Sequence, residues 1–373
     1  MISIVIDTGF GDAGKGSAVD YLVRKTLESD SGYKPIVVRF NGGHQCGHRV
    51  VHKDKEHVFS NFGSGTLRGA TTYWGRQCTI DPIGFMKEYD ILVKKGVRPT
   101  IYADPECPIT TPYDKQTNHI VEGLYKHGST GTGFGATIAR NEGTHKLRLI
   151  ELRSTAMIKW KFSKLFFTFQ DELKVEEKEF LIAVEKMLEV ITMIPEEQYF
   201  NESQGRHYIF EGNQGIMLDH EYGFFPHVTR SNTMSRGVKK YVEMMPHYIP
   251  EMYYITRAYG TRHGNGPFPG EKHAKALKLK NTENEKNVRD VWQGDFRTAP
   301  LNYDLLKYAL MIDEYTREFT AVPNTLFVTC NDQLKGKFPL IKDDKIYWGS
   351  QLYLDSLYHN VVYTHSEDWS STL

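Results

Sequence analysis

ISIVIDTGFGDAGKGSAVDYL, residues 2–22, is the stretch that decides the fold we expect for this chain. Its apolar beginning predicts a buried strand, its glycines predict a tight turn, and its end predicts a helix that begins near Lys15. Such a turn places unpaired backbone N–H groups and the positive end of a helix dipole at one point, which suits a phosphate group. The stretch therefore predicts a phosphate site after the first strand of an α/β fold.

Two nucleotide-binding motifs overlap in this turn. Its glycines have the spacing G-x-G-x-x-G of dinucleotide sites, and it also contains most of a P-loop, ending in Gly14-Lys15. Gly16, however, stands where a P-loop has the Ser or Thr that holds the metal. Asp12 lies at the tip of the turn, and a carboxylate repels a phosphate unless a cation bridges them or the acid transfers a proton. We therefore expect Mg²⁺ here and a chemical role for Asp12.

The composition limits the class of protein. With 373 residues, of which 40% are hydrophobic, the chain can bury a large core. Lys+Arg and Asp+Glu balance at 46 each, so no net charge favours nucleic acid or a membrane surface. The 4 cysteines have no C-x-x-C spacing, and no apolar run approaches the roughly 20 residues of a membrane span. We expect a soluble, cytoplasmic protein without nucleic-acid or membrane partners.

Apolar strands followed by glycine-rich polar loops recur along the chain. After the first strand, the predicted strands are residues 36–39, 101–103, 208–210, 253–257 and 326–330. This pattern predicts a P-loop-like α/β protein. We expect a mostly parallel central sheet with helices on both faces, smaller helical and loop subdomains, and a site along one sheet edge. Residues 151–200 have helical spacing without a chemical motif, so we expect a helical insertion in a single domain of residues 1–373.

A second candidate loop, GGHQCGH at residues 42–48, follows the second predicted strand. Zinc ligation by His44 and His48 would require a helix or a third ligand, and the glycines argue against a helix. Two histidines satisfied by their own loop are another interpretation. We prefer an acid or electrostatic role, because a histidine can donate to an oxyanion near neutral pH.

Later loops carry uncharged hydrogen-bonding groups. HGSTGTGFGA, residues 127–136, contains Ser129 and Thr130 and is typical of a mobile anion-binding loop, although a flexible linker has the same composition. Gln214 and Thr229 follow strands, where they suit ligand binding or ordinary turns. Asp332, at a strand end, resembles the carboxylates that accept from the ring N–H and amino group of a nucleobase.

Two other classes of function compete with phosphoryl chemistry. A dinucleotide-binding oxidoreductase needs an acid at the end of the second strand, but that strand ends in Arg39, which disfavours NAD and leaves NADP open. A non-catalytic nucleotide sensor would keep the phosphate loops, but it could dispense with Asp12 and His48.

Taken together, six blocks of the chain resemble the adenylosuccinate synthetase family, in the family's order. The family patterns are G-D-E-G-K-G, G-G-H-N-A-G-H, T-T-G-x-G-x-G, E-G-x-Q-G, Y-V-T-S-S-N-T-T and T-R-x-G-x-G-P-F-P-T-E. They correspond here to residues 11–16, 42–48, 129–135, 211–215, 227–233 and 261–271. Gln45 and Cys46 replace Asn and Ala of the second pattern.

The resemblance implies a homodimeric, Mg²⁺-dependent ligase of purine biosynthesis. An NTP γ-phosphate would pass to the 6-oxygen of a purine nucleoside monophosphate, and the amine of L-aspartate would then displace it. Asp12 would take the N1 proton and ligate Mg²⁺ together with the Gly47 carbonyl. His48 would stabilise the 6-oxyanion and the transferred phosphoryl group, which Lys15 and the neighbouring amides would cradle.

The resemblance also implies the residues that bind the nucleotides. They are Gly11, Ala13, Gly14, Gly16, Ser17, Asn41, Gln45, Ser129, Thr130, Gln214, Thr229 and Gly264. Arg140 is the candidate for an arginine that reaches the phosphate of the partner subunit.

Departures from the family patterns bear on the substrates. The arginine-rich aspartate loop, T-T-G-R-R-R-R-T-G-W, corresponds to DVWQGDFRTAP at residues 290–300, where only Arg297 matches. The donor-base segment T-K-L-D becomes Thr-Cys-Asn-Asp at 329–332, which keeps Asn331 and Asp332 as candidates but loses the lysine. The C-terminal S-T-G-P tract becomes THSED at 364–368. These departures argue against strict guanine specificity, so we expect ATP, dATP or GTP as the phosphoryl donor.

The short chain and its remodelled loops resemble the phage branch of the family, which acts on dGMP to make a precursor of 2-aminoadenine deoxynucleotide. We therefore expect dGMP as the acceptor, with an ordinary IMP-specific enzyme as the alternative. The 2-amino group of guanine needs room, which the small Ala13 could supply. On this hypothesis, Ala13→Glu shifts the preference toward IMP.

Overall fold

The computed structural model of this chain describes residues 1–126, 128–165, 174–201, 205–280, 285, 287, 291–335, 337–349, 351–358 and 360–364. Across these residues, nine strands form a central sheet in the order β15-β12-β9-β1-β8-β2-β5-β6-β7, and each of its pairings is parallel. Its strands are β1 (Ile2–Asp7), β2 (Lys34–Arg39), β5 (Thr71–Trp74), β6 (Ile101–Ala103), β7 (Ile191–Met193), β8 (Arg206–Glu211), β9 (Glu251–Arg257), β12 (Val322–Thr329) and β15 (Val361–Tyr363).

Strand β1 lies in the middle of this sheet and is buried on both faces. Ile4 and Ile6 belong to the largest core cluster, whereas Val5 joins a second cluster with residues of α1 (Lys15–Glu28). Successive side chains of a strand point to opposite faces, so an almost continuously apolar strand needs cover on both sides. The helix begins at Lys15, as the sequence predicts.

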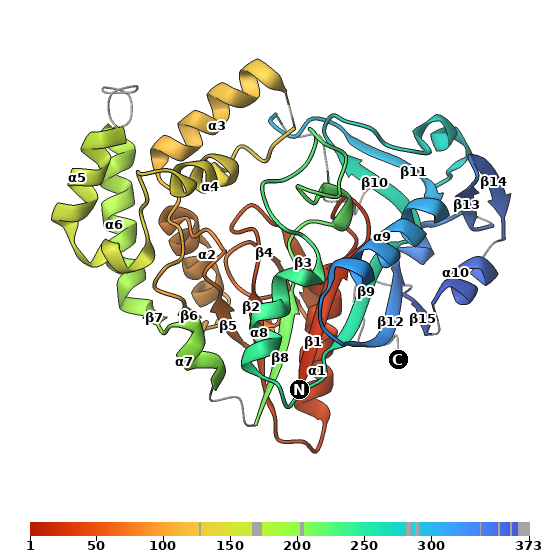
Figure 1. The fold of residues 1–373 in the computed structure, drawn as a ribbon, viewed down its shortest axis with the longest axis horizontal. Coiled ribbons are helices and arrows are strands. Elements are labelled where there is room, and N and C mark those ends of the chain that lie inside the picture. The colour runs from red at the N-terminus through yellow and green to blue at the C-terminus, as the bar shows by residue number, and fades with distance from the viewer. Residues whose placement is uncertain are drawn as a thin grey trace.

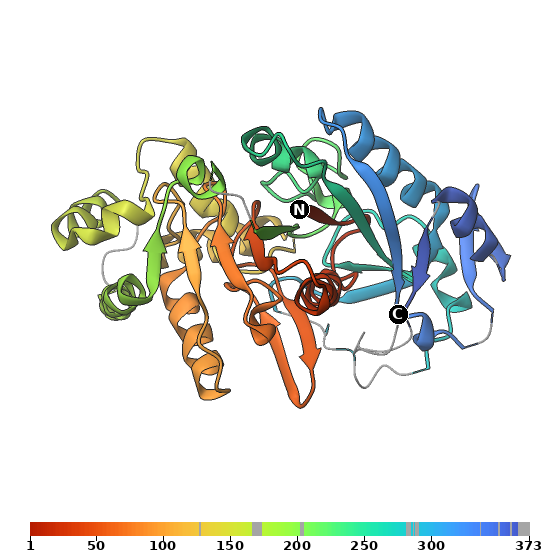
Figure 2. The same cartoon turned by 90° about the horizontal axis from the view of Figure 1, so that it is seen from below.

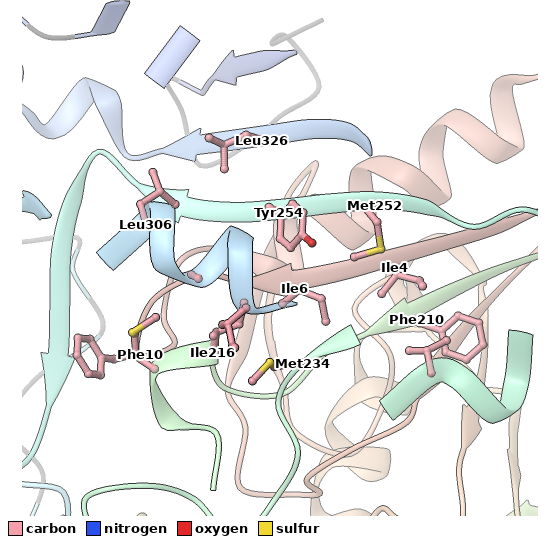
Figure 3. Packing of buried hydrophobic residues seen from close by; sticks show 14 of the residues in the cluster. Ile4, Ile6, Phe10, Phe210, Ile216, Met234, Met252, Tyr254, Leu306 and Leu326 are labelled. Atoms are coloured by element: carbon pink, nitrogen blue, oxygen red, sulfur yellow. The ribbon is translucent and has the colours of Figure 1, made fainter. Parts of the chain in front are cut away.

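Helices cover both faces of the sheet (Figure 2). α1 packs against β1, β2 and β8, and α9 (Tyr303–Thr316) packs on the opposite face. Figure 3 shows the largest core cluster, which contains Leu306 of α9 together with Ile4 and Ile6 of β1. The predicted α/β fold is therefore confirmed. The remaining helices are α2 (Pro82–Lys94), α3 (Pro112–Tyr125), α4 (Phe134–Glu142), α5 (Thr155–Leu165), α6 (Lys174–Val190), α7 (Glu196–Asn201), α8 (Lys239–Met244) and α10 (Gln351–Leu357).

Two smaller sheets accompany the central one. β3 (His48–His52) and β4 (Lys55–Phe59) form an antiparallel hairpin. The other sheet has the order β10-β11-β13-β14, with β10 (Tyr259–His263), β11 (Phe296–Asn302), β13 (Pro339–Lys342) and β14 (Lys345–Trp348). Since β10 follows β9 almost directly, it extends beyond the carboxyl edge of the central sheet (Figure 1).

The segment predicted as a helical insertion, residues 151–200, is not helical throughout. α5 and α6 pack with α2 around a third core cluster, as scaffold helices would. The segment then adds β7 to the edge of the central sheet and continues into α7. The prediction missed β7 because three residues after a helix carry too little strand pattern.

The carboxyl ends of β1, β8, β9 and β12 meet at one edge, because parallel neighbours all run the same way. Figure 1 shows α3 and α4 on one side of this edge, with β10 and β11 on the other. Open α/β sheets bind their ligands at this position. None of the helices in the described residues is long and apolar enough to cross a bilayer.

Candidate active site

A cavity of about 830 Å³ lies over this carboxyl edge. Its volume is in the range of small-molecule and cofactor sites. Most of the residues predicted from the sequence line it: Gly11, Asp12, Gly14, Lys15, Gly16, Ser17, Gln45, Gly47, His48, Ser129, Thr130, Gln214, Thr229 and Asp332. Loops far apart in the sequence therefore converge on one site.

Asp7, the last residue of β1, organises the glycine-rich turn. Its carboxylate accepts the backbone N–H groups of Gly9 at 2.8 Å and Ala13 at 3.1 Å. It also binds the Lys15 ammonium at 3.0 Å, and Lys15 is 3% exposed. Sequence reasoning missed Asp7, although an acid between a strand and a glycine-rich turn was its signal. The Lys15 charge at the predicted phosphate cradle is thus already balanced by a carboxylate.

Asp12 occupies the tip of the turn in the left-handed conformation, with φ 60°. Its backbone carbonyl accepts the Nε–H of Arg257 at 2.6 Å, which fixes the peptide. Its carboxylate is 30% exposed and lies 3.6 Å from Nε2 of His263. The turn therefore holds the backbone of Asp12 and leaves its carboxylate facing the cavity.

Close packing explains the missing P-loop hydroxyl at Gly16. A Cβ on Gly16 would lie 3.0 Å from the carbonyl oxygen of Arg49 and 3.0 Å from the Cβ of His48. Real Cβ atoms rarely approach other atoms so closely. Hairpin strand β3 therefore packs directly on the first turn of α1, which brings His48 next to the positive end of the helix.

His48 and Glu211 form a buried pair beneath the cavity. Nδ1 of His48 lies 2.7 Å from the Glu211 carboxylate, which the Ser64 hydroxyl also contacts. Burial alone would raise the pKa of Glu211, but the contacts with His48 and Arg39 lower it to about 2. Burial lowers the pKa of His48, against the opposing effect of Glu211. The arrangement is that of a neutral imidazole whose Nδ1–H donates to an ionised carboxylate.

Arg39 does not face the cavity. It is 0% exposed and donates to the side-chain oxygen of Asn213 at 2.7 Å and to the Gly43 carbonyl at 3.3 Å. It lies 4.0 Å from Glu211. Arg39 therefore holds the loops beneath the site and cannot reach a 2′-phosphate, so the NADP hypothesis loses the residue on which it rested.

The two histidines of residues 42–48 have separate partners. Nε2 of His44 lies 3.0 Å from the Thr132 carbonyl, and Nδ1 lies 3.3 Å from the Thr79 hydroxyl. His44 is thus satisfied by neighbouring loops, whereas His48 pairs with Glu211. Within the described ranges, His, Cys, Asp and Glu form no cluster of three or more that could hold a metal.

The donors expected for Mg²⁺ fit that ion. The Asp12 carboxylate and Gly47 both line the cavity, and carboxylate and carbonyl oxygens are the ligands that Mg²⁺ prefers. Mg²⁺ commonly uses few protein ligands and completes its shell with water and substrate phosphates. The residues present therefore suit a metal that a nucleotide brings with it.

Three side chains of α3 hold the predicted anion-binding loop. The Glu122 carboxylate accepts the backbone N–H groups of residues 128 and 129, and Asn118 binds the Ser129 hydroxyl at 2.9 Å. Nε2 of His119 lies 2.8 Å from the Gly131 carbonyl. The loop is therefore tied to a helix along much of its length, which a flexible linker would not be. His127, which begins the predicted segment, lies outside the described residues.

Buried side-chain amide atoms in the cavity wall lack a hydrogen-bond partner within the part of the chain that the structure describes. Both side-chain polar atoms of Gln45 and the carbonyl oxygen of Gln214 are buried without a hydrogen bond to any described residue. A buried unsatisfied polar group costs about 1–3 kcal/mol. Because both residues line the cavity, a ligand with matching donors and acceptors would remove this cost.

Ala13, Asn41 and Gly264 do not line the main cavity, contrary to prediction. The Ala13 side chain is 4% exposed and packs in the core beside α1, so it supplies no room for a 2-amino group. Asn41 is buried between loops, where it accepts the N–H of Asn213 at 2.8 Å. A Cβ on Gly264 would lie 2.7 Å from the Gln293 carbonyl oxygen, so this glycine permits close packing of loops.

Arg140 and Arg297 are likewise engaged away from the cavity. Arg140, 8% exposed, binds both carboxylate oxygens of Asp114 at 2.8 and 2.9 Å. These contacts do not support its assignment as an arginine that reaches a partner subunit. Arg297 on β11 binds Glu271 at 2.8 Å and the Gly266 carbonyl at 2.9 Å, so it does not face the cavity as the aspartate-binding residue was expected to.

Two arginines that sequence reasoning missed do line the cavity. Arg257, at the end of β9, pairs with Glu285 at 2.6 Å. Arg262 on β10 donates to the carbonyls of Pro267 and His227 at 2.7 and 3.2 Å. Its guanidinium also lies 4.3 Å from the ring centroid of Phe10. For Arg262, its place in the T-R-x-G block was the available signal, and for Arg257, its position at the end of a predicted strand.

The predicted donor-base segment closes the cavity beside the opening turn. The Thr329 hydroxyl donates to the Ala13 carbonyl at 2.8 Å, and a Cβ on Gly14 would lie 3.3 Å from the Thr329 methyl. Asp332 lines the cavity, whereas Asn331 does not. The hydroxyl of Thr364 is buried without a described partner. The rest of the THSED tract, residues 365–368, and Asp290 of the predicted aspartate loop lie outside the described residues.

The adenylosuccinate synthetase family model matches residues 4–323. Adenylosuccinate synthetases of Saccharophagus degradans and Borrelia duttonii are 32% and 30% identical to this chain, over 72% of its length. The match covers 64% of each relative, so the chain spans less than two thirds of their length.

Two solved structures share the fold. The adenylosuccinate synthetase of Plasmodium falciparum has a TM-score of 0.72 at 20% identity, covering 93% of this chain and 82% of that one. The succinoaminodeoxyadenylate synthetase of cyanophage S-2L, bound to dGMP and dATP, has a TM-score of 0.61 at 15% identity, covering 96% and 98%. With the family model matched over most of the sequence, this chain belongs to the adenylosuccinate synthetase family.

Proposed function

We propose that this chain is a C–N-forming ligase that joins L-aspartate to C6 of a purine nucleoside monophosphate at the expense of an NTP. The observation that carries the proposal is the meeting of Asp12, the His48–Glu211 pair and the first turn of α1 around one cavity. Phosphoryl transfer needs mainly positioning and charge stabilisation, which these groups supply.

In the first step, Asp12 takes the N1 proton of the purine, and O6 attacks the γ-phosphorus as the NDP leaves. In the second step, the amine of L-aspartate attacks C6, the phosphate leaves, and the amine releases a proton. A bound Mg²⁺ would neutralise the transferring phosphoryl group, with Asp12 and the Gly47 carbonyl as its protein ligands. The left-handed backbone of Asp12 supports this role, since the Asp12 carboxylate lines the cavity in which the proposal puts the purine.

His48 is the group that meets the negative charge on O6. Because its Nδ1 is bonded to Glu211, the ring has a fixed orientation, and the carboxylate stabilises a proton bound at Nε2. His48 can therefore take up a proton at Nε2 and, as an imidazolium, donate it to the developing oxyanion. The first turn of α1, which packs against His48, adds its backbone N–H groups to the same charge.

For the acceptor we propose dGMP, with IMP as the competing outcome. The structural match with the cyanophage enzyme covers nearly all of both chains, and the structure of that enzyme contains dGMP and dATP, which supports this choice. The departure of residues 329–332 from the family's donor-base segment supports it as well. Loss of the segment's lysine likewise supports ATP or dATP as donor. A cytoplasmic homodimer completes the proposal.

The test is phosphate release with L-aspartate and Mg²⁺, in which IMP, GMP and dGMP are each combined with GTP, ATP and dATP. We expect aspartate-dependent release, fastest with dGMP and an adenine donor. If turnover is fastest with IMP and GTP, the acceptor is IMP rather than dGMP, and the proposed ligase reaction still holds. Release that is independent of aspartate in every combination would defeat the ligase itself.

A further inference from the structure

Five Lys and Arg side chains in the described residues line the cavity, and four of them have a carboxylate partner. Lys15 pairs with Asp7, Arg49 with Glu56, Arg230 with Glu142 and Arg257 with Glu285. Arg262 is the fifth. Its hydrogen-bond partners are the backbone carbonyls of Pro267 and His227, which carry no charge.

The neighbourhood of Arg262 is short of negative charge. Arg262 on β10 stands directly opposite Arg297 on β11 in the antiparallel register. The nearby Glu271 binds Arg297 at 2.8 Å. Arg262 and Arg297 thus have one carboxylate near them, and this carboxylate pairs with Arg297, which lies outside the cavity. Burial, followed by the charge of Arg297, lowers the pKa of Arg262 to about 10.

Arg262 is also held in a fixed position. It is 2% exposed, its guanidinium lies over the Phe10 ring, and its Nε–H is buried without a partner among the described residues. A buried charge is costly unless an opposite charge or sufficient hydrogen bonds accompany it. An anion in the cavity would provide both. The adjacent residue, His263, lies 3.6 Å from the Asp12 carboxylate, so the position borders the reacting centre.

We infer that Arg262 anchors a carboxylate of the L-aspartate substrate, in the role that the resemblance gives to Arg297. The inference rests on the proposed ligase reaction and names the residue that selects its amino-acid substrate. Phosphate groups have other sites, at residues 14–17 of the opening turn and at Ser129 and Thr130. Among the described residues, Arg297, the arginine expected to bind the aspartate carboxylates, is paired with Glu271.

The test compares Arg262→Gln with the matched variant Arg297→Gln, using the monophosphate and NTP that the parent enzyme prefers. We expect Arg262→Gln to raise the KM for L-aspartate on the order of 10- to 100-fold, as loss of a charge-assisted hydrogen bond predicts. The KM values for the two nucleotides should change less than about 3-fold. Succinate, a dicarboxylate without the amine, should inhibit the parent competitively with aspartate, and Arg262→Gln only weakly.

Other patterns of KM change in the two variants would overturn the inference. If Arg297→Gln raises the aspartate KM more than Arg262→Gln does, the resemblance has named the right residue. If Arg262→Gln raises the KM for the monophosphate or NTP instead, Arg262 is a phosphate ligand. If Arg262→Gln has a much lower Tm than the parent, Arg262→Lys provides the same comparison, because lysine keeps the charge and loses the planar pair of donors. A parent enzyme without aspartate-dependent turnover contradicts the proposed function, which is a separate result.

Discussion

Gly16 and its neighbour His48 show how much a single side chain can decide at the residue scale. Gly16→Ala would place a Cβ 3.0 Å from backbone and side-chain atoms of β3, so the hairpin must shift away from α1. Because His48 begins β3, that shift displaces the group proposed to meet the oxyanion. We expect kcat to fall about 10-fold or more, since small misplacements of catalytic groups are costly.

Gly123→Ala is the matched control for this substitution. Gly123 also lies in a helix, α3, but a Cβ there meets nothing within 4 Å. Alanine should keep activity and raise the free energy of unfolding by about 0.5–1 kcal/mol. Equal kcat for the two variants, measured at saturating substrates, would show that the contact between α1 and β3 does not matter for catalysis.

Asp12→Asn tests the proposed base. Asparagine tolerates the left-handed φ of 60° well, so the turn and its Arg257 contact should survive. We expect nucleotide binding by calorimetry to persist while turnover falls on the order of 10²-fold or more, as for removal of a general base. If Asp12→Asn turns over within a few-fold of the parent enzyme, a group other than Asp12 removes the N1 proton.

At the scale of elements, the phosphate loop depends on α3 and on the segment before β11. Trp292 stacks on His119 with ring centroids 4.1 Å apart and planes 6° from parallel. A Cβ on Gly131 would lie 2.6 Å from the Trp292 ring, so the indole covers both the loop and the helix that holds it. Trp292, in the stretch that resembles an aspartate loop, thus packs against the predicted anion-binding loop.

Trp292→Ala should therefore raise the KM for the nucleoside monophosphate about 5- to 10-fold, because stacking and loop order are lost together. The kcat and the KM for aspartate should change little. Trp292→Phe, which keeps an aromatic face on His119, should restore most of the affinity. A rise in all three KM values in Trp292→Ala, with no recovery in Trp292→Phe, would point to general unfolding instead.

At the scale of the whole molecule, His207 in the middle of the chain joins β8 to the first strand and the first helix. On β8 it lies 2.9 Å from the Ser3 hydroxyl of β1 and 2.6 Å from the Thr26 hydroxyl of α1. Burial, followed by the N-terminal ammonium, lowers its pKa to about 3. The unfolded chain binds a proton at His207 below its ordinary pKa of 6.5, whereas the folded chain does so only near pH 3.

Stability is therefore lost as the pH falls from about 6.5 toward 3, and His207 accounts for about 2 kcal/mol of the loss between pH 7.5 and 5. His207→Gln removes this titration and keeps a hydrogen-bonding side chain. Urea unfolding at both pH values should show a smaller loss of stability in the variant than in the parent, by about that amount. Identical losses would mean that His207 does not link folding to pH.

Much of the fold could be predicted from the sequence because its signals are local. The first strand, its turn and the start of α1 lie within 22 residues, and the strands corresponding to β2, β6, β8, β9 and β12 are apolar runs, of which β2, β8 and β9 precede glycine-rich loops. In the central sheet, the prediction missed β5, β7 and β15, which have four residues or fewer. Short strands are specified by the neighbours with which they pair rather than by their own pattern.

For the candidate site, too, some features follow from the sequence and others only from the tertiary structure. By itself, the sequence determined most of the loops that line the cavity and named Asp12 and His48 as candidates for its chemistry, since glycine turns, Asp12 and His48 stand in short motifs. Only the tertiary structure decided that Asp7 balances Lys15, that Glu211 orients His48, and that Arg262 rather than Arg297 faces the cavity. The physical reason is that a motif fixes local conformation, whereas the charge available to a ligand depends on which distant carboxylate has already paired with it.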